Sequence, residues 1–276
     1  MNVSDWIANA TAKLESDGIG TARLDSLVLL EDITNKDRAY LLAHPELELS
    51  SKEIVVLTNL LNQRAIHIPL AYVRGKTEFY GRDYVITPSV LEPRPESETM
   101  IEQLIKLSKS SSPRLDWSTD IRLADVGSGS GALGITAKLE LPNIDVELLD
   151  IDEKALEVSK RNVDLFTLSI NTILSDLLTN TSHAYDILLC NLPYVPDEHQ
   201  INEAAMHEPK IAIFGGPDGL DLYRKLFDQV KNSSNKPLYI LTECLPPQHD
   251  TLHNIAMAGG YSLFDSEDFI QVFEKQ

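Results

Sequence analysis

The sequence predicts an α/β protein in which helices cover both faces of a doubly wound, mostly parallel sheet, with a small helical domain before it. Two observations support this prediction. From residue 121 onward, short apolar runs alternate with longer segments of helical periodicity, which is typical of a parallel sheet with crossover helices. Before residue 70, apolar residues recur at helical spacing instead. We therefore expect two domains joined by a short linker.

The composition is that of an acidic globular protein. The chain has 276 residues, of which 43% are hydrophobic, and 24 basic against 42 acidic residues give a net charge of −18. Such a charge opposes nonspecific binding to nucleic-acid phosphates. No apolar stretch approaches the roughly 18 residues that a membrane span needs, and the N-terminus lacks the features of a signal peptide. We therefore expect a cytoplasmic protein with no membrane partner.

Cysteine and histidine usage predicts neither a disulfide framework nor a metal site. The two cysteines, Cys190 and Cys244, are better explained as reduced core thiols. His249 and His253 stand four residues apart, but Asp250 follows the first of them where a metal-binding helix would carry a glutamate. A solvated helix face accounts for this pair.

The chain divides into three segments at the level of sequence. Residues 1–70 are expected to form the helical domain, in which Ser50 and Glu53 have capping-box spacing before an apolar helical face. Residues 71–95 form a linker, and its part 79–86, with Gly81 at the turn, predicts a β-hairpin. Residues 96–276 are expected to form the α/β domain, beginning with a helix at 96–107.

Within the α/β domain, strands and helices alternate in order. The expected strands are 122–126, 146–150, 172–174, 187–190 and 238–242, followed by a last, antiparallel strand at 269–273. The expected helices are 132–139, 153–166, 220–231 and 247–258.

A glycine-rich loop follows the first of these strands. Asp125 ends the strand, and the next residues are Val126, Gly127, Ser128, Gly129, Ser130 and Gly131. Glycine allows the backbone to turn tightly and to approach a ligand closely. The second strand ends at Asp150, whose carboxylate can accept hydrogen bonds from both hydroxyls of a ribose. The pattern indicates a site for the adenosine half of a cofactor.

Two cofactors fit such a loop. Gly129, Gly131 and Gly134 match the GxGxxG fingerprint of dinucleotide-binding folds. In those folds, however, the glycine loop begins where the strand ends, whereas Gly129 lies four residues beyond Asp125. An acidic residue followed by GxGxG fits S-adenosylmethionine better, because Asp125 can organise the loop near the cationic methionine end. We favour S-adenosylmethionine over a nicotinamide cofactor or a loop without a ligand.

A further contact to the adenine is expected after the third strand. Asp176 could accept a hydrogen bond from the adenine amino group while Leu177 packs against the ring. The alternative is an aspartate that caps a helix or belongs to a turn.

The tetrapeptide Asn191-Leu192-Pro193-Tyr194 follows the strand 187–190, at the edge where open α/β sheets bind ligands. The Asn191 side chain and the main-chain carbonyl of Leu192 can accept both hydrogens of a substrate NH₂ group, and the Tyr194 ring can cover a planar group. Holding these hydrogens orients the nitrogen lone pair for an in-line displacement at a sulfonium methyl. The motif predicts methyl transfer to a planar amide or amine nitrogen, with Asn191 also bordering the cofactor.

With these motifs, nearly the whole chain resembles the HemK/PrmC-type glutamine N5-methyltransferases. The resemblance extends to Pro69-Leu70-Ala71-Tyr72-Val73-Arg74-Gly75, Phe79-Tyr80-Gly81, Pro93-Arg94-Pro95-Glu96-Ser97-Glu98, Glu208-Pro209 and Gly215-Gly216-Pro217-Asp218-Gly219-Leu220. It implies a seven-stranded Rossmann-like methyltransferase domain, an N-terminal domain that docks the substrate, and S-adenosylmethionine as cofactor. The implied reaction is N5-methylation of the glutamine in the Gly-Gly-Gln motif of peptide-chain release factors.

Two charged residues outside the tetrapeptide are also candidates. Arg94, between two prolines, is expected either to contact the substrate or to pair with an acidic neighbour. Glu208 is expected to brace the Asn191 loop rather than to act directly in catalysis.

The sequence departs from the family at Leu192, where the family pattern Asn-Pro-Pro-Tyr has a proline. A leucine still supplies the backbone carbonyl, and Pro193 still favours an extended residue 192. The fixed φ of a proline is lost, so the loop is expected to be less preorganised.

Three alternatives stay open on this basis. They are glutamine methylation of a ribosomal protein, adenine-N6 methylation of nucleic acid with the same motif, and a catalytically weak relative that binds a translation factor. The helical domain and the charge of −18 favour a protein substrate. We expect a monomer that does not bind nucleic acid directly.

Overall fold

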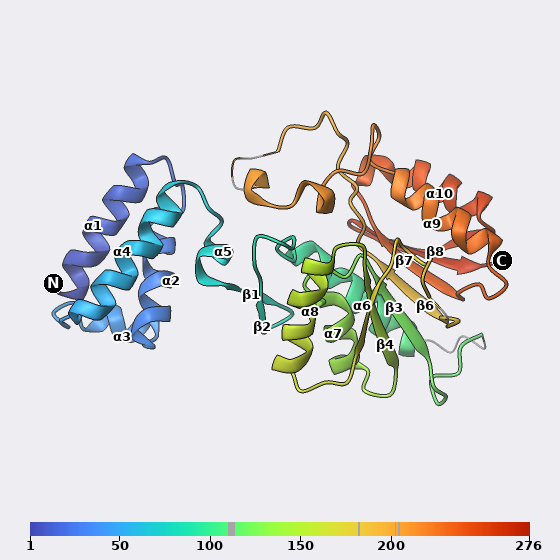
Figure 1. Cartoon of the computed structure of the whole chain (residues 1–276), viewed down its shortest axis with the longest axis horizontal. Coiled ribbons are helices and arrows are strands. Elements are labelled where there is room, and N and C mark those ends of the chain that lie inside the picture. Colours follow the sequence, from blue (N-terminus) through green and yellow to red (C-terminus); the bar gives the residue numbers. More distant parts are fainter. Residues whose placement is uncertain (110–113, 182, 202, 204) are drawn as a thin grey trace. The chain divides into compact units, whose positions relative to one another are not determined.

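The computed structural model describes residues 1–109, 114–181, 183–201, 203 and 205–276. These residues form two compact units (Figure 1). The first comprises Met1–Lys76 and Ile201–His207, and the second comprises Thr77–Gln200 and Glu208–Gln276. No helix of the described residues combines the length and the apolar character that crossing a bilayer requires. The assignment of separate roles to residues 1–70, 71–95 and 96–276 remains a prediction.

The first unit is helical. Its helices are α1 (Val3–Ser16), α2 (Ala22–Thr34), α3 (Arg38–Ala43), α4 (Ser51–Ala65) and α5 (Leu70–Arg74). The expected capping box starts α4: Ser50 Oγ accepts from Glu53 N at 3.2 Å, and the Glu53 carboxylate accepts from Ser50 N at 2.7 Å. Within the core, buried Asp25 accepts a hydrogen bond from Arg64 Nε at 2.7 Å.

A β-hairpin leads into the second unit. Strands β1 (Lys76–Phe79) and β2 (Arg82–Val85) are joined by Tyr80 and Gly81, which both have positive φ, as a two-residue hairpin turn of type I′ requires. Gly81 therefore occupies the turn position that the sequence predicts. The buried Asn162 side chain accepts from Val85 N at 2.7 Å and donates to Val85 O at 2.9 Å, which holds β2 on the sheet domain.

The second unit contains a seven-stranded sheet, and the predicted fold class is confirmed. The strands are β3 (Arg122–Val126), β4 (Asp145–Asp150), β5 (Asn171–Leu174), β6 (Ile187–Cys190), β7 (Tyr239–Glu243), β8 (Tyr261–Glu267) and β9 (Ile270–Lys275). Their order is β5-β4-β3-β6-β7-β9-β8. The first five are mutually parallel, whereas β9 is antiparallel to β7 and β8.

No strand was predicted at the position of β8, and the last strand, predicted at 269–273, is Ile270–Lys275 in the structure. Strand β8 is an edge strand, and most of its side chains are at least partly exposed. An edge strand with little burial carries no apolar alternation, so the sequence contains no strong signal for it.

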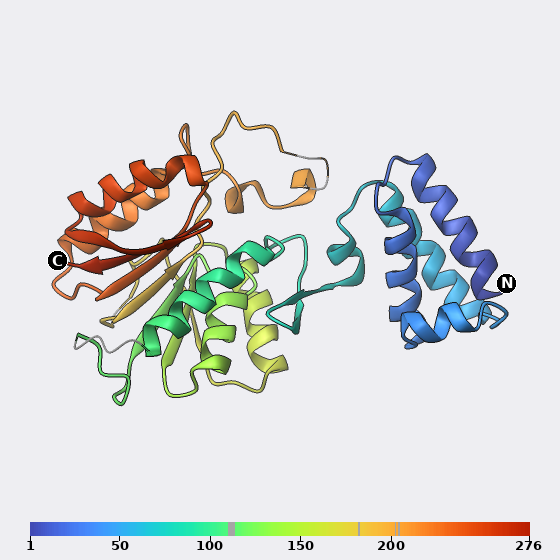
Figure 2. The same ribbon diagram turned by 180° about the vertical axis from the view of Figure 1, so that it is seen from behind.

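Helices cover both faces of the sheet (Figures 1 and 2). Helices α6 (Glu98–Lys109), α7 (Ala132–Glu140) and α8 (Glu153–Leu165) pack on one face, and α9 (Asp221–Asn232) and α10 (His249–Ala258) pack on the other. Alternate strand residues face the two layers: Ile187 and Leu189 of β6 join one core, and Leu188 and Cys190 join the other.

The strand order places a topological switch point between β3 and β6. After β3 the chain adds β4 and β5 on one side, and then returns to add β6 on the other. The ends of these strands are in register, because Val126 lies opposite both Leu149 and Cys190. At such a switch point the loops diverge and leave a crevice at the carboxyl ends of the strands, where α/β proteins bind ligands.

Candidate active site

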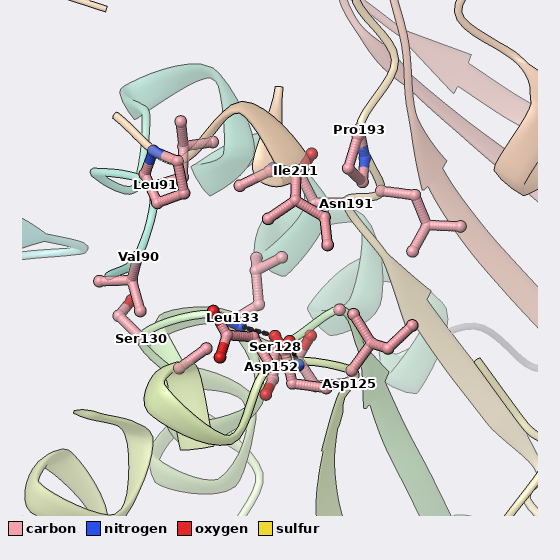
Figure 3. A pocket seen from close by; sticks show the side chains of 18 of the residues that line it. Val90, Leu91, Asp125, Ser128, Ser130, Leu133, Asp152, Asn191, Pro193 and Ile211 are labelled. Atoms are coloured by element: carbon pink, nitrogen blue, oxygen red, sulfur yellow. Dashed lines mark hydrogen bonds between the residues drawn. The ribbon is translucent and has the colours of Figure 1, made fainter. Parts of the chain in front are cut away.

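A cavity lies at this edge of the sheet, entirely within the second unit (Figure 3). It is lined by most of the residues that the sequence analysis selected, namely Asp125, Gly127, Ser128, Gly129, Ser130, Asp150, Asp176, Leu177, Asn191, Leu192 and Pro193. Asp125 and Ser128 lie on one wall, and Asn191 and Pro193 lie across the cavity from them (Figure 3). Gly131, Tyr194, Arg94 and Glu208 are not among the described residues that line it.

The glycine loop is anchored to β4. The N–H groups of Gly127 and Ser128 both donate to Leu149 O, at 2.8 and 2.9 Å, and Gly129 N donates to Asp150 Oδ2 at 2.8 Å. Gly127 and Gly129 have φ values of +73° and +53°, which favour glycine. A Cβ on Gly129 would meet no atom within 4 Å, so the loop leaves open space there for a ligand.

Gly131 and Gly134 both have structural roles at the start of α7. A Cβ on Gly134 would lie 2.4 Å from Leu148 Cδ2 and 2.9 Å from Asp125 Cβ, so this glycine lets α7 approach the sheet. Gly131 has a φ of +79° and precedes α7 as its N-cap. The GxGxxG spacing therefore has a structural cause that does not require a dinucleotide.

Two buried polar atoms of the cavity wall have no hydrogen-bond partner among the described residues. Asp125 Oδ2 accepts from Gly134 N at 2.8 Å, but Asp125 Oδ1 and Ser128 Oγ have no hydrogen bond in the described part of the chain. Buried polar groups without partners are rare in native structures, and a bound polar ligand is one explanation for them. Burial raises the pKa of Asp125 to about 7, and the nearby charge of Asp150 adds to the rise.

The raised pKa of Asp125 predicts a stability that falls as pH rises. Its ordinary pKa is 3.8 and its native pKa is about 7, so between these values the native state holds more protons than the unfolded state. Stability then falls with pH across this window, by at most about 1.4 kcal/mol per pH unit for one group. We expect Asp125→Asn to reduce the fall of the melting temperature between pH 4.5 and pH 7.5 in the ligand-free protein. An unchanged slope in this variant would contradict the assignment.

Asp150 and Asp176 differ in their surroundings. Asp150 is buried and its Oδ1 accepts from Asp152 N at 2.9 Å; burial raises its pKa, and the backbone N–H donors oppose that rise. A carboxylate has about four acceptor sites, so it can still accept from a ligand. Asp176 pairs with Lys225 and lies in a turn, where its carbonyl accepts from Thr179 N at 3.2 Å. Asp176 therefore belongs to a turn, which was the alternative to adenine binding, and it also lies on the cavity wall.

Asn191 directly follows β6, and its Nδ2 donates to Ser97 Oγ at 2.9 Å. Leu192 is buried, with its Cδ2 3.1 Å from the position that a Cβ on Gly127 would occupy. Its N–H, which a proline would lack, donates to Tyr223 Oη at 3.4 Å. Tertiary contacts thus hold Leu192 in place, whereas a proline at this position would be held by the restriction of its own φ.

Tyr194 is held by two hydrogen bonds. Its Oη donates to Glu243 Oε1 at 2.9 Å, and its main-chain carbonyl accepts from Gln248 Nε2 at 2.8 Å. Burial and the charge of Glu243 both raise the pKa of the phenol. The ring does not line the described cavity, so its expected place over the substrate plane stays a prediction.

Arg94 and Glu208 pair with each other. Arg94 Nη2 lies 2.5 Å from Glu208 Oε2, and Glu208 Oε1 accepts from Glu92 N at 3.4 Å. Burial raises the pKa of Glu208, and the charge of Arg94 opposes the rise. Glu208 thus braces the segment around Arg94, and its expected role in bracing the Asn191 loop stays a prediction.

Three site residues were not selected from the sequence: Ser97, Tyr223 and Glu243. Ser97 stands in the Pro93–Glu98 motif, which could have drawn attention to it. Glu243 ends the apolar strand β7 much as Asp150 ends β4, so a carboxylate at a strand end was an available signal. Tyr223 lies on α9, and nothing in its sequence context indicates that its Oη reaches Cys190 O at 2.9 Å.

Comparison with known proteins agrees with this architecture. The model of the PrmC N-terminal domain matches residues 5–75, and that of the methyltransferase small domain matches residues 109–209. The release factor glutamine methyltransferase of Koribacter versatilis is 32% identical over 264 residues, covering 92% of this chain and 90% of that protein. The enzyme of the same name from Coxiella burnetii is 30% identical over 243 residues, covering 87% and 85%.

A solved methyltransferase from Pyrococcus furiosus shares the fold, with a TM-score of 0.51 and 15% identity over 82% of this chain and 99% of that one. The fold and the matching domain define an S-adenosylmethionine-dependent methyltransferase, and S-adenosylmethionine is the cofactor of this class, as the sequence predicts. Within this class, the chain belongs to the release factor glutamine methyltransferase family.

Proposed function

We propose that this protein transfers a methyl group from S-adenosylmethionine to the side-chain nitrogen, N5, of the glutamine in the Gly-Gly-Gln motif of peptide-chain release factors. Membership of the family supports the substrate. The observation that carries the chemistry is the position of Asn191. Its carboxamide follows β6 on the wall of the cavity and is held through Nδ2, which leaves Oδ1 as the end that can accept a substrate N–H.

The proposed reaction is a single displacement. When bound, S-adenosylmethionine supplies a methyl group on a positively charged sulfur. An amide nitrogen is a poor nucleophile because its lone pair is delocalised into the carbonyl. Asn191 Oδ1 and the main-chain carbonyl of Leu192 accept its two hydrogens, orient the lone pair and stabilise the positive charge that develops on nitrogen. The N–C bond would form as the S–C bond breaks, sulfur would keep the electron pair, and nitrogen would release one of its two protons to solvent.

The cavity residues divide between cofactor and substrate in this proposal. Asp150 accepts the ribose hydroxyls, and Asp176 and Leu177 contact the adenine. The loop from Gly127 to Gly131 surrounds the methionine part, together with Asp125 Oδ1 and Ser128 Oγ, which have no partner among the described residues. Pro193 and Tyr194 shape the substrate site, and the pair of Arg94 and Glu208 supports it.

The proposal extends to partners and place of action. The helical domain of residues 1–70 docks the release factor, the protein acts as a monomer, and it works in the cytoplasm. Neither nucleic acid nor a membrane takes part in the reaction. The net charge of −18 supports a protein partner.

The test uses purified protein, methyl-labelled S-adenosylmethionine and two release factors, one intact and one with its Gly-Gly-Gln glutamine replaced by alanine. We expect label on the intact factor and none on the altered one. Equal labelling of both would place the methyl group elsewhere. Label only on ribosomal protein, DNA or RNA in parallel reactions would favour one of the alternative substrates.

A catalytically weak relative is a second candidate, and Leu192 is the observation that favours it. It predicts release-factor binding without methyl transfer, and transfer gained on Leu192→Pro. The proposed function predicts instead that the unaltered protein transfers the methyl group. It also predicts that Leu192→Pro does not raise the rate, because this change removes the N–H that donates to Tyr223 Oη.

A further inference from the structure

Two buried polar side chains, those of Ser97 and Glu243, lie near Asn191 and have no role in the proposed chemistry. Ser97, in the short 3₁₀ helix Pro95–Ser97, and Glu243, at the end of β7, are 2% and 0% exposed. Ser97 lines the cavity with Asn191, and Glu243 is not among the lining residues. Ser97, Asn191 and Glu243 thus come from three distant parts of the sequence, and the first and last of them can affect how the Asn191 side chain is oriented.

The orientation of the Asn191 amide decides what the cavity offers to a substrate. A carboxamide has an acceptor end and a donor end of nearly equal shape. With Oδ1 toward the substrate, Asn191 accepts from an NH₂ group; with Nδ2 there, two donors face each other. In the structure Nδ2 donates to Ser97 Oγ at 2.9 Å, so the acceptor end is the one left for a ligand.

Ser97 can hold this orientation only if its own hydroxyl proton points elsewhere. Glu243 has acceptor capacity left over: its Oε1 accepts from Tyr194 Oη at 2.9 Å, while its buried Oε2 has no hydrogen-bond partner among the described residues. A carboxylate accepts and does not donate. Burial raises the pKa of Glu243, and interactions with Ser97, Tyr194 and Asn191 all oppose this rise, as donors to a carboxylate do.

We propose that Ser97 and Glu243 are positioning residues that hold the Asn191 carboxamide with its oxygen toward the substrate nitrogen. The Ser97 proton is directed to Glu243, and the Ser97 oxygen thereby stays an acceptor for Nδ2. This inference rests on the proposed function, because it explains how that site selects a group with two N–H donors. It assigns no contact with the substrate to Glu243.

The kinetic test compares Ser97→Ala, Ser97→Thr and Glu243→Gln. Loss of one hydrogen bond predicts a kcat about tenfold lower for Ser97→Ala. Loss of a charged acceptor predicts a kcat about 10- to 100-fold lower for Glu243→Gln. The KM for the release factor and the affinity for S-adenosylmethionine should stay within about twofold. Ser97→Thr keeps a hydroxyl and should restore kcat. Ser26→Ala, which removes another buried serine hydroxyl, is the matched control and should behave as the unaltered protein.

A second measurement does not depend on the substrate. Proteins with ¹⁵N-labelled asparagine side chains give carboxamide NH₂ signals, and the Asn191 signal is the one that Asn191→Ala removes. In Ser97→Ala its exchange with water should be at least about tenfold faster, and in Ser97→Thr it should be unchanged. Unchanged exchange in Ser97→Ala, or a Thr variant that behaves like Ala in both measurements, would overturn the inference. If the unaltered protein methylates no release factor, the proposed function fails, and the exchange measurement alone decides whether the network exists.

Discussion

Asn191→Ala is expected to lower the rate of methyl transfer to the release factor by roughly two to three orders of magnitude, the loss that follows removal of one preorganised group from a developing charge. The substitution removes Oδ1, one of the two proposed acceptors for the amide hydrogens. It leaves the glycine loop, Asp150 and Asp125 in place, because none of their hydrogen bonds is made to the Asn191 side chain. The loop bonds to β4, the Asp150 carboxylate accepts from the N–H groups of residues 129 and 152, and Asp125 accepts from α7. Cofactor affinity should therefore remain largely intact.

The measurement combines single-turnover transfer with calorimetric binding of S-adenosylmethionine. Asn232→Ala is the control: this exposed asparagine donates to Asp228 O within α9 and lies away from the cavity. Transfer by Asn191→Ala at a rate close to that of the control would show that Asn191 is not an acceptor in the reaction. A parallel loss of cofactor binding would show instead that Asn191 acts mainly on the cofactor.

Gly219→Ala is expected to be the most disruptive of the conservative changes around the motif. Gly219 has a φ of +81°, and a Cβ there would lie 2.0 Å from Tyr194 O and 2.5 Å from Gln248 Nε2. These two atoms are hydrogen-bonded partners, so the new methyl group must displace the link that holds Tyr194. Strain at φ costs about 1–2 kcal/mol and overpacking costs about 1–3 kcal/mol, which together predict a stability loss of roughly 2–5 kcal/mol.

The same change should reach catalysis, because a displaced Tyr194 carbonyl shifts the adjoining Asn191 loop. A misplacement of about 1 Å at a reacting group can cost about 100-fold in rate. Gly81→Ala is the matched control, since Gly81 has a φ of +70° but a Cβ there meets nothing within 4 Å. It should cost only the strain of about 1–2 kcal/mol and leave transfer within about twofold. Equal melting temperatures and rates for the two variants would contradict the steric argument.

Local patterns were sufficient for much of the fold. The capping box at Ser50 and the turn at Gly81 depend on residues a few positions apart, so both could be predicted from the sequence. The five parallel strands were also located, because buried strands are continuous apolar runs. Strand β8 could not be predicted in the same way, since its edge position leaves it with an exposed and irregular pattern.

The sequence by itself determined the class of protein. The glycine loop after Asp125, the strand end at Asp150 and the tetrapeptide from Asn191 are short motifs, and each gains meaning from the strand that it follows. Backbone demands such as the positive φ at Gly127 are local, so they are visible in the chain.

Only the tertiary structure decided which side chains support these motifs. Ser97 and Asn191 are 94 positions apart in the chain, yet they share a hydrogen bond. Asn191 and Glu243 lie together because β6 and β7 are parallel and in register, with Cys190 opposite Thr242. Packing between elements distant in sequence also decided three other contacts. Glu208 pairs with Arg94, Tyr223 Oη accepts from Leu192 N, and Tyr194 Oη donates to Glu243. Such contacts leave no periodicity in the chain, because the register and the strand order exist only once the sheet has formed.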